Sequence, residues 1–414
     1  MFGYLKQKIA VCKELGFARL ALLPLAAFIV AILLALSKIM RVRVHQAQNV
    51  RIGHFTVPMA LRYLELSKSK NSLRGRGINI FAVRSVTSSN VFLEKMWKRK
   101  VRLISGNLGW LIVDLFERIP NNHVCIKTSD CDRAGLIIQS PPCLTFHPKE
   151  FNRGISFLKN LGLEEGQKFV CLHVRDSSYL AKSWSHFGYS QGHDWSHHDY
   201  RNSEINTYVP AAEALADMGY VVFRMGAVVE KPLVSKHPKI IDYATNGMRT
   251  EFLDIFLGAH CTFCVSTGSG WDSIPQIFRR PSLYVNFLPY VTMMCLVRDL
   301  TIYMKQIVDA ETKLILNLSE IISRDIQTTY SAHDYVTARA EFRDMNSDEL
   351  VNAVTEMAAR VEGTFVETPE QKQMQAKLKH ILSNHPKLQP TPNYYPVRAE
   401  FASCFLSNYP NFLD

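Results

Sequence analysis

The sequence is poor in the residues that mark fibrous and linker proteins. Its 414 residues include only 20 glycines and 18 prolines, with no internal repeat and no low-complexity tract. This composition excludes a collagen-like or linker protein. Charged residues make up 21% and hydrophobic residues 47%, which is typical of globular proteins and argues against long disorder. A single core rarely grows beyond about 250–300 residues, so we expect two domains or one large domain with appendages.

The cysteines show neither a disulfide framework nor a repeated zinc-ligand motif. There are nine, an odd number without regular spacing. Cys261 and Cys264 form a CxxC motif, but it lies in an apolar, strand-like run and has no second CxxC. We interpret it as a buried reduced pair rather than a zinc site. This cysteine usage is typical of a reducing compartment.

Positive charge is concentrated at one end of the chain. Residues 1–62 contain nine basic residues and one acid, a net charge of +8 out of +11 for the whole chain. A nucleic-acid-binding protein usually carries its basic surface on its fold. Here the charges flank an apolar run, which favours a membrane surface and argues against nucleic acid as a partner.

That apolar run covers residues 20–37 and predicts a membrane anchor within residues 1–43. As a helix it would be about 27 Å long, slightly less than a hydrocarbon core of about 30 Å, and Pro24 is expected to kink or interrupt it. Basic residues on both sides leave a full span and an in-plane insertion open. A buried core helix is the alternative. Residues 38–43 are basic and do not resemble a cleavage site, which argues against a signal peptide. We expect removal of residues 1–43 to release a soluble enzyme.

The second half of the chain alternates strand and helix signals. Strands are predicted at 169–174, 220–225, 240–243, 261–265 and 282–287, and helices at 205–218, 250–258 and 271–278. This alternation is typical of a doubly wound parallel sheet.

The remaining patterns are less regular. They predict helices at 57–66 and 91–97, strands at 78–83 and 101–104, and either a helix or a buried strand at 108–116. Beyond residue 297 the pattern is mainly helical, with a capping signal at 346–349 and a second amphipathic helix at 368–382. The predicted organisation is two Rossmann-like domains facing a cleft, 44–160 and 161–295, followed by a helical extension, 296–414.

Two motifs are placed to bind a phosphate. Arg175 and Asp176 follow the strand that ends near His173, and ligands of open α/β sheets bind at that end. An arginine there can donate two hydrogen bonds to a phosphate; a surface ion pair with Asp176 is the alternative. The loop 266–270, Ser-Thr-Gly-Ser-Gly, lies between a strand and a helix, where backbone amides can cradle a phosphate. It is neither a Walker A loop nor GxGxxG, so an ordinary turn is its alternative.

The polar stretch 184–202 contains several histidines. His193 and His197 are four residues apart, but no third ligand has a defined spacing, so we interpret the stretch as a loop lining a sugar or nucleotide cleft rather than a metal site. A surface loop is the alternative. His198, Tyr200 and Arg201 are the expected ligand-binding residues of this loop.

Gly53 and His54 lie where a strand-like segment leads into a helix. They could face the cleft, bind the acceptor and, for His54, act as a base; a structural glycine beside a solvent-exposed histidine is an equal alternative. The DxD pair of Asp130 and Asp132 lies in the loop-rich stretch 125–147 and does not follow a predicted strand, so we expect no requirement for a divalent metal.

These motifs, taken in order, resemble one family of bacterial glycosyltransferases associated with surface-polysaccharide loci. The resemblance covers nearly the whole chain after the anchor. It rests on these segments: 51–54, 173–179, 198–202, 224–226 and 266–270. More distantly, the HxR motif of residues 173–175 and the segment 254–269 are similar to GDP-fucose-dependent fucosyltransferases.

The resemblance implies the GT-B architecture and a metal-independent transfer. Residues 44–160 are then the expected acceptor domain and residues 161–295 the expected donor domain. Arg201 is expected to bind the donor, and His198 and Tyr200 the acceptor.

The resemblance also implies that Arg175 contacts the donor diphosphate and that Asp254 contacts the nucleobase or ribose. The residues implied to line the nucleotide site are Ser266, Thr267, Gly268 and Ser269. The residues after the HxR motif, Asp-Ser-Ser-Tyr, depart from the family pattern, which leaves the donor base and sugar open, with a GDP-linked sugar as one candidate.

The sequence therefore predicts a glycosyltransferase at the cytoplasmic face of the inner membrane. It would move a sugar from a nucleotide-sugar donor to a lipid-linked or polysaccharide acceptor, with no cofactor beyond the donor. Asp176, His54 and His173 are unranked candidates for the base. A nucleotide-sugar epimerase of the same fold and a non-catalytic scaffold of a polysaccharide assembly complex are the alternatives.

Overall fold

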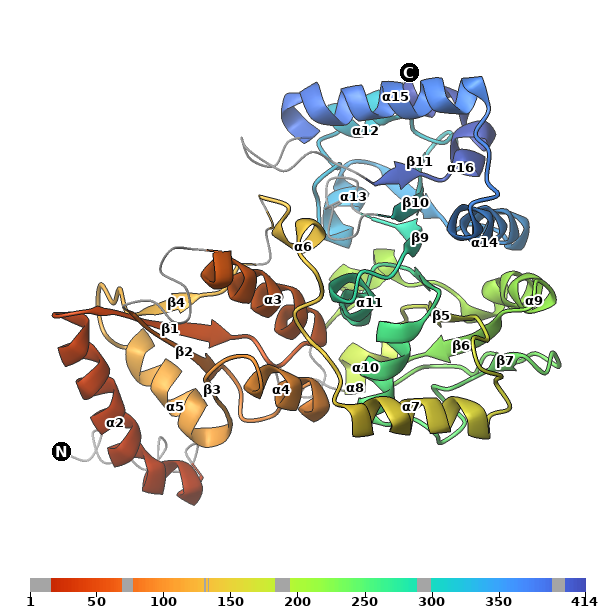
Figure 1. Ribbon diagram of the computed structural model, residues 1–414. Helices are drawn as coiled ribbons and strands as arrows, with labels where there is room; N and C mark the ends of the chain where they lie inside the picture. Colours follow the sequence, from red (N-terminus) through yellow and green to blue (C-terminus); the bar gives the residue numbers. More distant parts are fainter. Residues whose placement is uncertain are drawn as a thin grey trace. The chain divides into compact units, whose positions relative to one another are not determined.

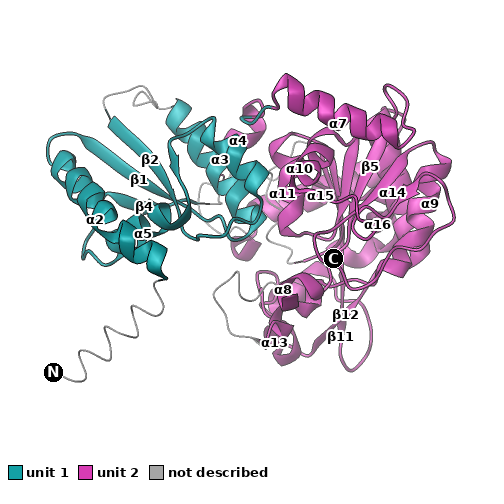
Figure 2. Ribbon diagram, turned by 90° about the horizontal axis from the view of Figure 1, so that it is seen from below, with its two compact units in different colours: residues 1–131, 143–145 teal, residues 132–142, 146–414 magenta. Residues whose placement is uncertain are grey.

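The computed structural model describes residues 16–68, 77–129, 132, 134–182, 194–288, 299–388 and 399–414. The chain divides into two compact units (Figure 2). Unit 1 comprises residues 1–131 and 143–145, and unit 2 comprises residues 132–142 and 146–414. The change from unit 1 to unit 2 therefore comes before residue 160, where the sequence predicted a domain boundary.

Unit 1 is a small α/β fold built on a parallel sheet of strand order β3-β2-β1-β4. Its strands are β1 (Arg41–Ala47), β2 (Gly77–Val83), β3 (Leu103–Ile104) and β4 (Cys125–Lys127). Its helices are α2 (Phe17–Ser37), α3 (Ile52–Lys68), α4 (Val91–Lys98) and α5 (Gly106–Glu117). Within this unit, α2 and α5 cover one face of the sheet and α3 covers the other (Figure 1).

Helix α5 settles the ambiguity at residues 108–116. Gly109 lies against the backbone of β3, where an added Cβ would come within 2.2 Å of the Ile104 carbonyl oxygen. The glycine thus permits close packing of the helix on the strand. Leu111, Ile112 and Phe116 are buried in the unit's core, and their spacing places them on one helix face.

Helix α2 belongs to the core of unit 1, which corrects the expectation that residues 1–43 form a separable anchor. Ala26, Val30 and Leu33 are buried in one cluster with residues of α5 and β1. The helix continues through Pro24 without interruption. Residues 41–43, expected as the basic flank of an anchor, begin β1, a central strand. By length and composition, α2 is also the one described helix able to cross a membrane, with a mean hydropathy of 2.7.

Unit 2 is built on a seven-stranded parallel sheet of order β13-β10-β9-β8-β5-β6-β7. This confirms the predicted parallel α/β sheet. Its strands are β5 (Phe169–His173), β6 (Val221–Met225), β7 (Ile240–Ile241), β8 (Phe263–Ser266), β9 (Ser282–Phe287), β10 (Leu300–Met304) and β13 (Glu400–Phe401). Strands β11 (Gln306–Asp309) and β12 (Ala340–Arg343) form a separate antiparallel pair.

Helices cover both faces of this sheet. The helices of unit 2 are α6 (Leu136–Gln139), α7 (Pro148–Asn160), α8 (Ser178–Lys182), α9 (Val209–Asp217), α10 (Glu251–His260), α11 (Ser273–Ile277), α12 (Leu318–Ser323), α13 (Ala332–Thr337), α14 (Ser347–Glu362), α15 (Pro369–Asn384) and α16 (Ser403–Asn408). Helices α9 and α14 pack together on one face, while α7, α10 and α11 gather on the other (Figure 2). Asn346 caps α14 through a capping box with Glu349, as predicted.

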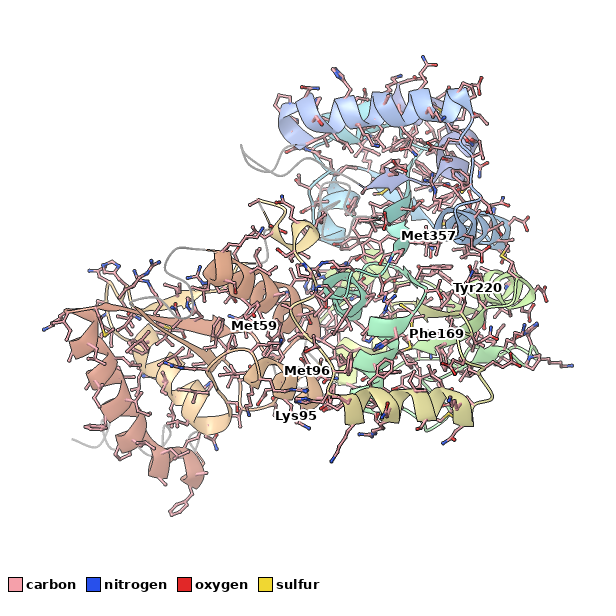
Figure 3. The ribbon with its side chains drawn as sticks, in the orientation of Figure 1. Met59, Lys95, Met96, Phe169, Tyr220 and Met357 are labelled. Carbon is pink, nitrogen blue, oxygen red and sulfur yellow. The ribbon has the colours of Figure 1, made fainter. Side chains whose placement is uncertain are left out.

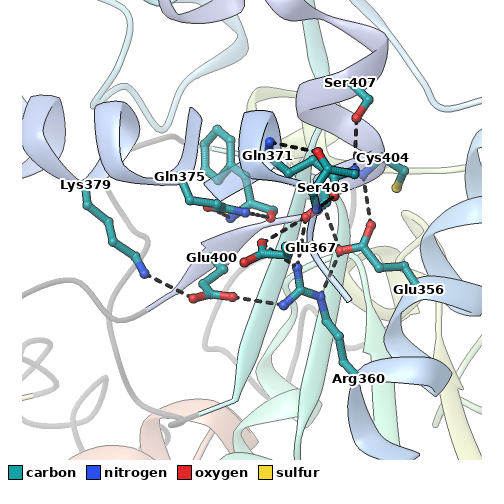
Figure 4. Close-up of polar contacts among 12 residues, drawn as sticks. Glu356, Arg360, Glu367, Gln371, Gln375, Lys379, Glu400, Ser403, Cys404 and Ser407 are labelled. Atoms are coloured by element: carbon teal, nitrogen blue, oxygen red, sulfur yellow. Dashed lines mark hydrogen bonds and ion pairs between the residues drawn. The ribbon is translucent and has the colours of Figure 1, made fainter. Parts of the chain in front are cut away.

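The C-terminal part of the chain is not a purely helical extension. Strands β10 and β13 complete the seven-stranded sheet, and all five residues of β10 are buried. A short strand buried on both sides has no polar alternation and does not stand out in the sequence. Arg360 links α14 to β13, because it pairs with Glu356 of α14 at 2.8 Å and with Glu400 of β13 at 2.9 Å (Figure 4).

Candidate functional site

The strand order of unit 2 creates a switch point between β5 and β8. The chain passes from β5 to β6 on one side, and then returns to place β8 on the other side of β5. In open α/β sheets, ligands bind in the crevice outside the carboxyl ends of the strands at such a point. His173 and Ser266, which end the two strands, are paired in register. The two predicted phosphate-binding motifs are therefore neighbours.

Hydrogen bonds join the two motifs. The backbone N–H of Thr267 donates to the His173 carbonyl oxygen at 3.3 Å, and the N–H of Arg175 donates to Thr267 Oγ1 at 3.0 Å. Ser269 Oγ lies 3.1 Å from His173 Nδ1. The His173 ring also stacks on Trp271, with centroids 5.5 Å apart and an interplanar angle of 17°. The turn after β8 is thus held rigidly against the end of β5.

Gly268 and Asp272 fix the shape of this loop. Gly268 has φ +76°, and an added Cβ would come within 2.7 Å of the Phe287 ring, so glycine is required there. Asp272 accepts hydrogen bonds from the Ser266 hydroxyl at 2.9 Å and from the Ser269 N–H at 2.6 Å. Burial raises the pKa of Asp272 to about 6. The sequence prediction missed Asp272, although Ser269 and Asp272 have the spacing of a capping box.

Two arginines lie at this edge. Arg175 Nη1 donates to the His198 carbonyl oxygen at 3.0 Å and to Asn202 Oδ1. Burial, and then the nearby charge of Arg201, lower the pKa of Arg175 to about 10, so it stays positive at neutral pH. The charge of Arg201 also acts to lower the pKa of Asp272, which places Arg201 near the same loop. The Nε of Arg201 is buried and has no hydrogen-bond partner among the described residues.

Lys305 is a third cation that the sequence prediction missed. It directly follows β10, and its side chain is only 3% exposed. Its Nζ donates to the Asn202 carbonyl oxygen at 2.9 Å and pairs with Asp344 at 2.7 Å. Burial lowers its pKa, and the charge of Arg175 acts in the same direction. Arg175 was identified by its position after a predicted buried strand. Lys305 has the same position after β10, but the sequence prediction did not include that strand.

The predicted polar loop is described from residue 194, so His186 and His193 lie outside the described residues. Residues Ser196–Arg201 form a 3-10 helix. Tyr200 is buried and packs on Tyr335, with ring centroids 5.5 Å apart. The His198 ring is half-buried, and its centroid is 4.0 Å from that of His197. Their acceptor-binding roles stay predictions.

Asp254 lies inside the protein, on α10. Its Oδ1 accepts a hydrogen bond from the Tyr243 hydroxyl at 3.1 Å, and its Oδ2 pairs with Arg249 at 2.7 Å. Its carbonyl oxygen accepts from Trp271 Nε1 at 3.1 Å. Burial raises its pKa to about 6. These contacts tie α10 to the residue on which His173 stacks. The implied contact with a nucleobase or ribose stays a prediction.

The three candidate bases have different settings. Asp176 accepts hydrogen bonds from the backbone N–H groups of Ser178 at 2.8 Å and Glu230 at 2.9 Å. Burial, followed by the charge of Arg224, lowers the pKa of His173 to about 4, so its ring is neutral at neutral pH. His54 is exposed in the first turn of α3, next to Gly53, and both belong to unit 1. The structure thus brings His173 and Asp176 beside Arg175, and leaves Gly53 and His54 in the other unit.

Side chains that could share a metal are not gathered in the described part of the chain, where no group of three or more His, Cys, Asp or Glu residues is placed to hold an ion. Cys261 and Cys264 are both buried, and neither is in a disulfide.

Comparisons with known proteins gave weak likenesses. No protein-family model matches the chain, and no curated protein matches it. A glycosyl transferase of family 9 from Veillonella parvula is 9% identical, with a TM-score of 0.43, over 78% of this chain and 97% of that one. E. coli ADP-heptose lps heptosyltransferase II is 12% identical, with a TM-score of 0.39, over 63% and 90%. The dodecameric iron-containing heptosyltransferase TibC, in complex with ADP-D-beta-D-heptose, is 12% identical, with a TM-score of 0.30, over 60% of each chain.

None of these three is a fucosyltransferase, so the more distant similarity stays a prediction. All three TM-scores are below 0.5.

Proposed function

We propose that this protein is a glycosyltransferase that uses a nucleotide-sugar donor in cell-surface glycan synthesis. The proposal rests on one observation: Arg175, Arg201 and the 266–269 loop lie at the same edge of the sheet, at the switch point between β5 and β8. A nucleoside diphosphate is the ligand that suits these groups, because its charge can be neutralised by guanidinium groups and its oxygens can accept from hydroxyl and amide donors.

The same groups would serve the reaction. When the sugar leaves, negative charge grows on the diphosphate, and Arg175 and Arg201 are placed to stabilise it without a metal. The acceptor hydroxyl needs a base within about 3 Å of its proton; Asp176, His54 and His173 are the candidates. We assign the lipid-linked or polysaccharide acceptor to unit 1, as in the GT-B architecture, with Gly53 and His54 at the start of α3 as its contacts.

Binding of ADP, GDP and UDP to the full chain, measured by calorimetry, tests the donor site. We expect Arg175→Ala and Arg201→Ala each to weaken binding at least tenfold, because a hydrogen bond to a charged group contributes about 1.5–3 kcal/mol. The control is Lys168→Ala. Lys168 is exposed, pairs with Glu362 and precedes Phe169 at the opposite, amino edge of the sheet; Phe169 and Tyr220 mark this edge in Figure 3.

The control should bind like the wild type, and all variants should still unfold cooperatively, which shows that they are folded. Wild-type affinity in both arginine variants would contradict the donor site. Incubation with nucleotide sugars then separates the functions: transfer supports the proposal, epimerisation without transfer supports the epimerase, and absence of turnover with any donor and acceptor supports the scaffold.

A further inference from the structure

Helix α2 has two apolar faces, and only one of them is covered. Its inner face packs in the core of unit 1 through Ala26, Val30 and Leu33. Its outer face includes Phe28, which is 63% exposed, and Phe17, which is 89% exposed. Every exposed residue of the helix is apolar; they are Phe17, Ala18, Ala21, Pro24, Leu25, Ala27, Phe28, Ala31, Ile32 and Ala35.

This outer face is a continuous stripe. Its members recur every three or four residues from Ala21 to Ala35, which places them along one side of the helix. The surface helix of a soluble domain normally carries polar residues on its outer side. A contiguous exposed apolar patch marks a surface that binds a protein or a membrane.

The charges around the stripe favour a membrane. Lys38 and Arg41 are exposed just beyond the end of α2. Positive residues beside an apolar helix face are attracted to anionic lipid headgroups. Two copies joined through this face would instead bring like charges close together, because residues 1–62 carry a net charge of +8.

The contacts of α2 argue against a transmembrane orientation. Near its start, Arg19 Nε donates to Asn107 Oδ1 at 3.2 Å, and the Arg19 guanidinium lies 4.6 Å from the centroid of the Trp110 ring. Further along, Leu33 is buried in the same core. Helix α5, on which α2 packs, also carries the acidic residues Asp114 and Glu117. A spanning α2 would either draw these charges into the hydrocarbon, which is costly, or leave the core of unit 1 exposed.

We propose that unit 1 docks on an anionic bilayer through the outer face of α2, with the helix in the plane of the membrane and both of its ends on the same side. An in-plane helix of this kind buries its apolar face at the boundary of headgroups and acyl chains. The proposal does not depend on the proposed function, because it concerns only unit 1 and lipid.

Flotation of the full-length protein with vesicles tests the surface. The vesicles contain phosphatidylcholine alone or with about a third phosphatidylglycerol, and we expect stronger binding to the anionic set. The double variant F28Q/I32Q should bind at least tenfold more weakly, with an unchanged unfolding temperature. The matched control is L314Q/V336Q, because Leu314 is 70% and Val336 is 71% exposed in unit 2; it should bind like the wild type. Nucleoside diphosphate binding should be the same in all three proteins.

The position of the helix ends tests the orientation. Tags are placed at both ends of the wild-type chain, and inverted inner-membrane vesicles are treated with protease. We expect both tags to be digested, because both ends lie on the same side. An N-terminal tag that is protected while the C-terminal tag is digested would show a span and overturn the proposal.

Two further results would also overturn it. One is equal flotation of F28Q/I32Q and the wild type. The other is a lipid-free wild-type dimer that F28Q/I32Q converts to a monomer without loss of flotation, which would make the stripe a self-association surface. If F28Q/I32Q does not fold, the tag experiment on the wild-type chain still decides the orientation.

Discussion

At the residue scale, His45 shows how burial controls protonation in unit 1. It lies fully buried in β1, with Nε2 3.0 Å from Asn79 Oδ1 and Nδ1 accepting from Arg62 Nε at 3.1 Å. These contacts suit a neutral ring that donates through Nε2. Burial, as the largest cause, lowers the pKa of His45 to about 4, and the charges of Arg62 and Arg43 act in the same direction.

We expect His45 to lower the free energy of unfolding as the pH falls. Between pH 6.5 and about 4 the unfolded chain binds a proton at this residue and the folded chain does not, so the free energy of unfolding decreases as the pH falls through this range. At pH 5 the loss is about 2 kcal/mol. His45→Gln should therefore lose less stability than the wild type between pH 7 and pH 5, measured by thermal unfolding.

Other groups titrate in the same range but do not alter this comparison. His173 also has a pKa lowered to about 4 and acts like His45. Asp254 and Asp272 have pKa values raised to about 6, so their protons are held more tightly in the folded state and they act in the opposite direction. All three are present in both proteins, so the difference between them reports His45. An equal loss in the two proteins would refute the assignment.

Individual site residues were predictable where a local signal existed. Arg175 follows an apolar run that is recognisable as a strand, so its place at the sheet edge could be inferred. Lys305 follows a strand of the same kind, but that run is short and lies in a region with helical patterns. Asp272 accepts hydrogen bonds from Ser266 and Ser269 inside the loop. In the sequence, only the capping-box spacing of Ser269 and Asp272 indicates this role.

At the element scale, α2 and β1 are inseparable parts of unit 1. Deletion of residues 1–43 would remove α2 together with three residues of β1, which pair with residues 77–79 of β2. It would also expose Leu111 and Phe116. Each large side chain that loses its burial gives up about 1.5–3 kcal/mol, against a total stability of about 5–15 kcal/mol.

We therefore expect residues 44–414 to give aggregated protein, contrary to the expectation from sequence that this truncation releases a soluble enzyme. The matched control is residues 16–414, which keep α2 and β1 intact. Solubility in mild detergent and cooperative thermal unfolding measure the outcome. A truncation at residue 44 that unfolds cooperatively at the temperature of the control would show that α2 adds nothing to the core.

Two elements of unit 1, β1 and α5, were not assigned from the sequence, for different reasons. β1 alternates arginine and valine at its start, and beside an apolar run those arginines suggested the flank of an anchor. Helix α5 has apolar residues on nearly every side, so periodicity could not separate helix from strand; the close approach of Gly109 to β3 decides it. In contrast, the predictions for β5, β6, β8 and β9 are confirmed within two residues, because each is an apolar run bounded by turn residues.

At the scale of the whole molecule, the strand order could not be predicted from the sequence. Alternating signals predicted a parallel sheet, and the structure confirms one in unit 2. However, β10 and β13 are neighbours although about a hundred residues separate them. Their pairing depends on how α14 and α15 pack, which no local pattern encodes. For this reason the sequence prediction treated the last third of the chain as an appendage.

The charges at the carboxyl ends of β5 and β8 determine whether the reaction needs a metal, because the charge of a diphosphate must be neutralised by side chains or by a metal ion. Four carboxylates among the described residues near this edge each have an internal partner. Asp176 accepts from two backbone N–H groups, Asp199 from Asn202, and Asp272 from Ser266 and Ser269; Asp344 pairs with Lys305. A divalent ion would have to displace these partners, whereas Arg175 and Arg201 already supply positive charge.

We therefore expect nucleoside diphosphate binding to be unaffected by metal removal. Calorimetry of the full chain in EDTA should give an affinity within about twofold of that measured with magnesium or manganese. A twofold change in affinity corresponds to about 0.4 kcal/mol. Added salt should weaken binding in both conditions, since the interaction is between charged groups. Binding that is lost in EDTA and restored by manganese would contradict this prediction. It would direct attention to the His193–Asp199 segment, where His193 lies outside the described residues and Asp199 lies three residues before Asn202, a partner of Arg175.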